Sequence, residues 1–387
     1  MTTHANLNPP HCEPVRWELR TALFLVLLLF VCGRVSFGQA PAADSVAGQA
    51  IQAQNAGNAS AALRLYREAL GQSPGWTDGW WRYGGMLYES KQYAVAGQAF
   101  ARLTELAPEN SLGFALLGLC EFEQSDWDNA ALHLNKALNH GKLPAGIAQV
   151  STFDLGLVLL HLNNRDGAIV AFKLLMHQAP NYPDLALALG AAELNFSSLP
   201  TAHDHGFEVA QLAGAAAVAV VTDQPKEAER LYRQLIEEHP SQSYAHFCLG
   251  LFFESEHRDD EAQKEFHDET LVNPGNALPW IWIARVALVQ QDPKTARSAL
   301  AHSRDIDPHN PIAFLIEGRS FMLEHQWEQA LVPLQEAEKR APQSSEVHYA
   351  LASTYSALHR VEAAKMERQL FLQASQADAP AEGSANQ

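Results

Sequence analysis

Apolar and small residues return every thirty-four positions between Ser243 and Ser344. Within each thirty-four-residue segment, apolar residues recur in two runs of helical spacing, and a short polar turn such as 257–260 separates the runs. Proline closes each segment, at Pro274, Pro308 and Pro342, and it should end the second helix because it lacks an amide donor. The pattern therefore predicts three consecutive helix hairpins.

Small residues indicate how the two helices of a hairpin pack. Gly250 or Ala284 stands in the first helix, and Ala262 or Ala296 stands in the second. Such residues let two helix axes approach to about 8–10 Å. Phe266, one turn after Ala262, is then expected to fill the groove between the helices.

This set of positions resembles the tetratricopeptide repeat, a family of thirty-four-residue helix-turn-helix units. Similar units begin near 77, 111 and 149, and a weaker one begins near 43. The resemblance implies an all-α fold, a right-handed superhelical solenoid of about nine hairpins. In that family the first helices line a concave face on which partners are held.

The middle of the chain departs from the period. Pro240 follows Pro180 after sixty residues, an excess of twenty-six that is less than one repeat, so one helix lacks an ordinary partner. Residues 195–205 are expected to form a loop. The run 207–221 is apolar on all sides, which predicts a buried helix too short to cross a membrane, paired with the helix after it. This segment is expected to change the superhelix pitch and to act as a hinge.

The last repeat is expected to be a solvent-facing cap, because Arg368 stands where the other repeats have a large apolar residue. The expected organisation of the whole chain has five parts. The parts are a signal peptide (1–40), an N-terminal repeat block (43–182), an irregular repeat-like segment (183–242), a C-terminal repeat block with its capping repeat (243–378) and a disordered tail (379–387).

The N-terminal forty residues have the layout of a secretory leader. Arg16 and Arg20 precede the apolar run 21–32, and small residues at Gly38 and Ala40 suit a signal peptidase. Export to the periplasm or the medium, with cleavage after Ala40, is the favoured interpretation. The alternative is an anchor in the inner membrane formed by 21–32.

Charge and cysteine content narrow the choice of partners. The chain has a net charge of -17, and without residues 1–40 it keeps 24 basic and 42 acidic residues. This balance argues against nucleic acid and against an anionic membrane surface as partners. Cys120 and Cys248 lie in first helices of well-separated repeats, so buried thiols are expected and a disulfide is not.

Transfer by register from the tetratricopeptide family gives candidate partner-binding residues on the concave face. They are Trp81, Tyr88, Phe122, Phe153, Tyr244, Phe247, Arg285, Arg319, Met322 and Tyr349, with Leu157, Leu251 and Leu288 beside them.

Two outcomes are open for this apolar and aromatic face. It suits an extended peptide or an amphipathic helix, but tight winding of the repeats would bury many of its side chains. Arg285 and Arg319 share one register in adjacent units and are expected to stack on one side of the array. Simple solvation is the favoured interpretation of both, and a bound carboxylate is the alternative.

The leading hypothesis is a non-enzymatic scaffold that holds a protein or peptide, in cell-envelope assembly or secretion, without cofactor or metal. One alternative is a metal-binding or enzymatic protein that uses His203 and His205 beside Asp204, although the sequence offers no third ligand nearby. Another is a self-assembling array that forms homo-oligomers. Neither a nucleophile elbow, a phosphate loop nor a paired zinc motif is found in the sequence.

Overall fold

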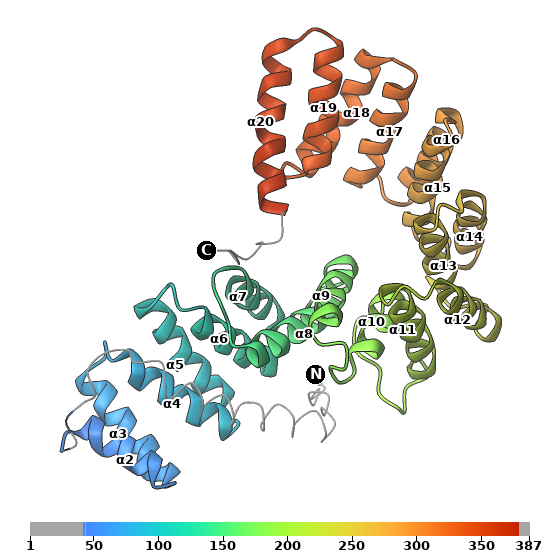
Figure 1. Cartoon of the computed structure of the whole chain (residues 1–387). Helices are drawn as coiled ribbons and strands as arrows, with labels where there is room; N and C mark the ends of the chain where they lie inside the picture. Colours follow the sequence, from blue (N-terminus) through green and yellow to red (C-terminus); the bar gives the residue numbers. More distant parts are fainter. Residues whose placement is uncertain (1–41, 43, 379–387) are drawn as a thin grey trace, which may run out of the picture. The chain divides into compact units, whose positions relative to one another are not determined.

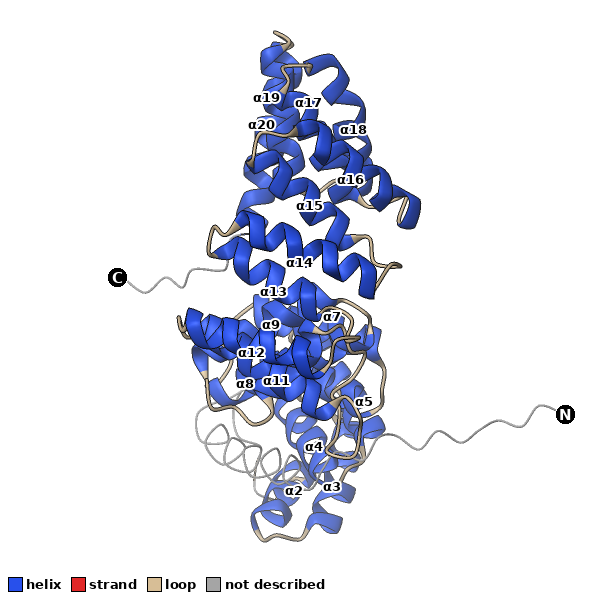
Figure 2. Cartoon of the chain, turned by 90° about the vertical axis from the view of Figure 1, so that its right-hand side faces the viewer, coloured by secondary structure: helices blue, strands red, loops and turns tan. Residues whose placement is uncertain are grey.

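The computed structural model describes residue 42 and residues 44–378, and the chain divides into two compact units, Met1–Gly214 and Ala215–Gln387. The predicted signal peptide, the alternative anchor and the predicted disordered tail lie outside the described residues. Within these, all regular structure is helical and no strand is found (Figure 2). The prediction of an all-α repeat fold is confirmed.

The first unit holds consecutive helices that pair into hairpins (Figure 1). Their bounds are α2 (Val46–Asn55), α3 (Ala59–Gln72), α4 (Thr77–Glu89), α5 (Tyr93–Leu106), α6 (Ser111–Glu123), α7 (Trp127–Asn139), α8 (Ala145–His161), α9 (Arg165–Gln178) and α10 (Leu185–Glu193). Helix α11 (Phe207–Val221) follows the loop 194–206 and contains the boundary between the units.

The second unit continues the same arrangement. Its helices are α12 (Pro225–Glu238), α13 (Ala245–Ser255), α14 (Asp259–Val272), α15 (Leu278–Val289), α16 (Pro293–Ile306), α17 (Pro311–Leu323), α18 (Trp327–Arg340), α19 (Ser345–Ala357) and α20 (Val361–Asp378). No helix among the described residues is both long and apolar enough to cross a membrane.

The turn inside each hairpin repeats one backbone motif. His257, Gln291, His325 and His359 all have positive φ, between 57° and 61°. The residue after each of them donates its N–H to a carbonyl five positions earlier, at 2.8 to 2.9 Å. This left-handed cap satisfies carbonyl groups at the end of the first helix, so the chain reverses at the same point in every repeat.

Close helix approach depends on the small residue of the first helix, as predicted. A Cβ added at Gly84 would lie 2.8 Å from the Phe100 ring, and one at Gly250 would lie 2.6 Å from the Phe266 ring. Both rings are fully buried. The glycine therefore makes the space that the large side chain of the second helix fills.

Helices α10 and α11 approach more closely than the helices of an ordinary hairpin. A Cβ at Gly190 would lie 2.0 Å from the carbonyl oxygen of Ala210, and one at Gly214 would lie 2.0 Å from that of Ala186. Backbone meets backbone here, with no large side chain between. The sequence leaves one helix of the middle without an ordinary partner, and the structure gives α10 this glycine-to-glycine contact with α11.

First helices crowd together within each unit. Besides consecutive helices, close packing joins α6 to α8, α8 to α10, α15 to α17 and α17 to α19. These helices are the first members of their hairpins, so they form the tighter layer of the stack. Side chains between them are enclosed on two sides.

The two cysteines of the repeat region are buried and neither forms a disulfide, with Cys120 0% and Cys248 3% exposed, which confirms the prediction. Burial raises the pKa of the Cys120 thiol, because a thiolate would lose its hydration. At the C-terminal end, Arg368 of α20 is exposed and donates to the Ser356 hydroxyl at 2.7 Å.

Candidate functional site

Four of the candidate partner-binding residues belong to the core. Trp81 is 6%, Tyr88 8%, Phe153 1% and Phe247 1% exposed. Trp81, Phe153 and Phe247 pack against the large aromatic residue of the second helix in their own hairpins, with centroids 6.2, 5.6 and 5.6 Å apart. The close packing of the first helices therefore buries these four side chains, which is one of the two outcomes that the sequence left open. A partner could contact them only by displacing other core residues.

Two further candidates lie half-buried at helix ends. Phe122 packs edge-on against Trp127 at the start of α7, with ring centroids 5.6 Å apart. Tyr244 precedes α13 with a φ of +69°, and its backbone N–H donates to the Glu269 carboxylate at 2.7 Å. Phe122 thus lies at the C-terminal end of α6 and Tyr244 at the N-terminal end of α13, and each contributes to how the chain turns there.

Arg285 and Arg319 lie on successive first helices and each has a carboxylate nearby. Arg285 is exposed, its guanidinium lies 4.1 Å from the Trp282 ring centroid, and its Nη2 is 4.0 Å from Glu254. Arg319 Nη2 is 2.9 Å from Glu346. Such partly exposed pairs contribute only about 0–1 kcal/mol to stability. A carboxylate from a partner would therefore exchange with these internal ones at little cost.

Met322 and Tyr349 complete the candidates in the second unit. Met322 is half-buried against the cluster formed by α17, α18 and α19. Tyr349 is 58% exposed, and its ring centroid lies 5.8 Å from that of Phe371. We call Arg285, Arg319, Met322 and Tyr349 the first-helix face of the second unit, because these side chains retain access to solvent.

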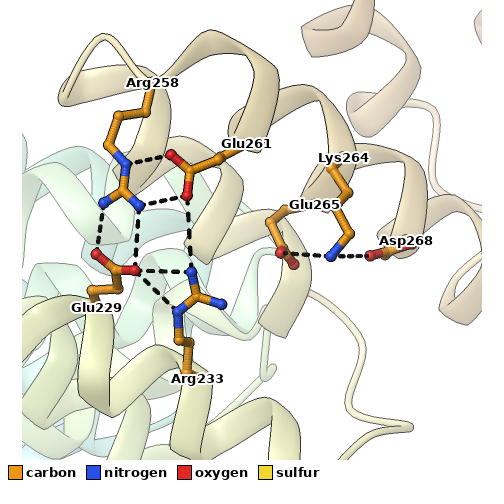
Figure 3. A network of polar contacts seen from close by, with 7 residues as sticks. All are labelled: Glu229, Arg233, Arg258, Glu261, Lys264, Glu265 and Asp268. Carbon is orange, nitrogen blue, oxygen red and sulfur yellow. Dashed lines mark hydrogen bonds and ion pairs between the residues drawn. The ribbon is translucent and has the colours of Figure 1, made fainter.

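A network of ion pairs ties α12 to α14 (Figure 3). Arg258 lies between Glu229 and Glu261, with N···O distances of 2.6 and 2.5 Å, and Arg233 approaches Glu229 to 2.9 Å. The Arg258 guanidinium also lies 4.2 Å from the centroid of the Phe253 ring. The hydrogen bonds raise the pKa of Arg258 and lower those of Glu229 and Glu261, so the network is fully charged at neutral pH.

Two groups in the second unit place three potential metal ligands within 4.8 Å of one another. In the first, His246 Nδ1 is 2.7 Å from Glu265, and Asp268 is the third member. Burial is the largest single effect and lowers the pKa of His246, but the hydrogen bond with Glu265 and the charges of Glu265, Asp268 and Glu269 together outweigh it, so the net shift is upward. The Lys264 ammonium lies 3.8 Å from both carboxylates (Figure 3), so this group is already charge-compensated by the protein.

The histidine and glutamate of the second group stand at the same register of the last hairpin as those of the first, whereas its third member comes from α18 of the hairpin before it. His348 Nδ1 is 2.8 Å from Glu367, its Nε2 is 3.0 Å from the carbonyl of Pro342, and Glu338 is the third member. Burial is the first cause that raises the pKa of Glu338, and the charge of Glu367 adds to it. In both hairpins the histidine and glutamate join the first helix to the second, which explains these groups as structural contacts.

The histidine pair of the middle loop lies between α10 and α11. Asp204, between His203 and His205, accepts hydrogen bonds from the Thr201 backbone N–H at 2.7 Å and from its hydroxyl at 2.9 Å. These bonds lower the pKa of Asp204. The carboxylate is thus used to close the turn before α11.

These features define a helical-repeat protein, because the same hairpin, left-handed turn and glycine-to-aromatic contact recur along the chain. In such proteins each hairpin packs mainly against the hairpins next to it in sequence. A family model described as "Tetratricopeptide repeat" matches residues 48–111, from α2 to the start of α6. The same thirty-four-residue period continues through the second unit, so hairpins of this kind extend beyond the residues that the family model matches. No curated protein matches the sequence significantly.

Solved structures with similar helical repeats include three bacterial proteins. MamA residues 41 to the end, from Desulfovibrio magneticus, is 15% identical over 46% of this chain and 100% of its own, with a TM-score of 0.38. The protein pilF of Pseudomonas aeruginosa is 17% identical over 61% and 99%, with a TM-score of 0.37. A tetratricopeptide repeat protein from Parabacteroides merdae is 12% identical over 72% and 98%, with a TM-score of 0.39.

Proposed function

We propose that this chain is a non-enzymatic scaffold that holds a protein partner on the first-helix face of the second unit. The observation that carries the proposal is the set of accessible side chains there, with an arginine stacked on an indole at Arg285 and an exposed ring at Tyr349. Arginine and aromatic side chains are the residue types that dominate binding energy at protein interfaces. A peptide or amphipathic helix with acidic side chains suits this combination.

We further propose that the partner belongs to the cell envelope and that the scaffold acts in its assembly or in secretion. This rests on the leader-like N-terminal sequence, with its apolar run 21–32 and the small residues before Pro41. Cell fractionation of the full chain, with N-terminal sequencing of the product, tests it. A protein that keeps Met1 and stays in the cytoplasm would refute the export part and leave the binding part standing.

The binding proposal is tested by capture from an envelope extract. The variant Tyr349→Ala with Arg285→Glu removes an exposed ring and reverses a charge on the first-helix face. The control, Val332→Ala with Arg230→Glu, also truncates an exposed apolar side chain to alanine and reverses an arginine charge, on the exposed sides of α18 and α12. We expect the first variant to lose the captured proteins and the control to keep them, with equal helicity by circular dichroism. Equal capture by both would refute the proposed face.

A further inference from the structure

A cavity of about 590 Å³ lies in the first unit, against α3, α4 and α5. Its lining comes from both second helices of the two N-terminal hairpins and from α4 between them. The lining residues are Arg67, Trp80, Tyr83, Val95, Gln98, Ala99, Ala101 and Arg102. None of them is a candidate of the first-helix face, so the cavity is a separate surface.

Arg67 is exposed to solvent and gives the cavity a positive charge. Its Nε donates to the Tyr83 hydroxyl at 3.3 Å, and this hydrogen bond raises the pKa of Arg67. Among the described residues, no carboxylate lies within 4.0 Å of its guanidinium. Arg102, across the cavity on α5, is paired with Glu105.

The wall beside Arg67 is apolar and held in place. Trp80 donates its indole N–H to the Pro74 carbonyl at 2.8 Å, which fixes the plane of the ring. Val95 is 37% exposed and Ala99 is buried, so the surface next to the indole offers aliphatic contact. A guanidinium that donates to a tyrosine hydroxyl thus stands next to an apolar wall in a pocket that is open to solvent, where a protruding side chain of a partner can enter.

We propose that this cavity binds a peptide segment of a partner protein in which an aspartate or glutamate stands beside a large apolar residue. The carboxylate pairs with the Arg67 guanidinium, whose planar fork suits a two-pronged contact. The apolar side chain lies against Trp80 and Val95. The positive charge in a strongly acidic protein selects the acidic residue, and the apolar wall distinguishes such a peptide from a small inorganic anion.

Panning of a displayed library of random short peptides against the full chain tests the proposal. We expect enriched peptides to carry Asp or Glu beside Phe, Leu, Ile or Trp. With one such peptide, labelled for fluorescence anisotropy, Arg67→Glu should weaken binding about tenfold or more, on the scale of a lost charge-assisted hydrogen bond. Gln98→Glu, which adds a negative charge to the same wall with almost no change in shape, should do the same.

Two controls separate this site from general charge and from the first-helix face. Arg64→Glu makes the same substitution one turn away on α3, outside the lining, and should weaken binding clearly less than Arg67→Glu does, because it changes the local charge but removes no contact with the peptide. Tyr349→Ala should also leave it unchanged. The proposal is overturned if no acidic and apolar peptide is enriched, if a folded Gln98→Glu variant binds as well as the wild type, or if inorganic phosphate displaces the peptide completely.

Discussion

Replacing Gly190 by alanine tests the backbone contact between α10 and α11. The added Cβ would lie 2.0 Å from the carbonyl oxygen of Ala210 and 2.4 Å from the amide nitrogen of Gly214, whereas ordinary Cβ contacts begin near 3.4 Å. The atoms in the way belong to the backbone, so no side-chain rotation relieves the clash. The two helices must move apart, and the packing around them must follow.

The expected cost follows from two opposing terms. Inserting a methyl group into a packed site costs about 1–3 kcal/mol and occasionally more, and rigid backbone neighbours place Gly190 at the upper end. Alanine returns up to about 1 kcal/mol because it is the better helix former. We therefore expect Gly190→Ala to destabilise this region by about 2 kcal/mol.

Hydrogen exchange is the appropriate assay, because repeat arrays do not always unfold in one step. The amides of α10 and α11 should lose protection in the variant, and urea unfolding followed by circular dichroism should begin earlier. Gly71 is the matched control, since it is also helical and a Cβ there meets nothing within 4 Å. Gly71→Ala should stabilise its helix by about 0.5–1 kcal/mol.

A double variant checks the mechanism. Gly214→Ala would place its Cβ 2.0 Å from the Ala186 carbonyl oxygen, across the same helix crossing. Because one separation of the helices relieves both clashes, the combined loss should be smaller than the sum of the single losses. A strictly additive loss, or a Gly190→Ala protein with wild-type protection, would show that α10 and α11 are not in backbone contact.

Three further outcomes follow from the second unit and from the buried thiol. Arg258→Gln should lower the free energy of unfolding by about 1 kcal/mol at pH 7 and at low salt. Arg258 lowers the pKa of Glu229 in the folded protein, so this contribution to stability is fully present above the ordinary glutamate pKa of about 4.3. It is lost as the pH falls through the lower pKa of the folded state. The variant and the wild type should therefore have the same stability in acid. Glu269→Ala removes the acceptor of two backbone N–H groups at the start of α13, at 2.7 and 3.3 Å, and should cost about 1–3 kcal/mol in urea unfolding, whereas Glu269→Gln keeps an acceptor oxygen and should cost less. Cys120 should resist iodoacetamide at pH 8 in the native protein and react after unfolding, as read by mass spectrometry, and rapid native labelling would contradict its burial.

The candidate site could be predicted from the sequence only in part. Register placed Arg285 and Arg319 at matching positions of successive first helices, and each has a carboxylate of the chain itself beside it, Glu254 and Glu346. The same register also selected Phe153 and Phe247, which are fully buried. A helical sequence pattern identifies which residues share one side of a helix. It does not show how closely the first helix of the neighbouring hairpin approaches that side.

The sequence by itself determined the hairpins, their period and their ends. These depend on contacts within a few residues, such as a glycine opposite a large side chain and a proline after the second helix, so they can be read from local spacing. Only the tertiary structure decided which first-helix side chains are accessible to solvent, that the backbones of α10 and α11 are in contact, and that Arg67 lies beside the apolar residues Trp80 and Val95. Each of these depends on helices from different hairpins, whose distance is set by the packing of everything between them.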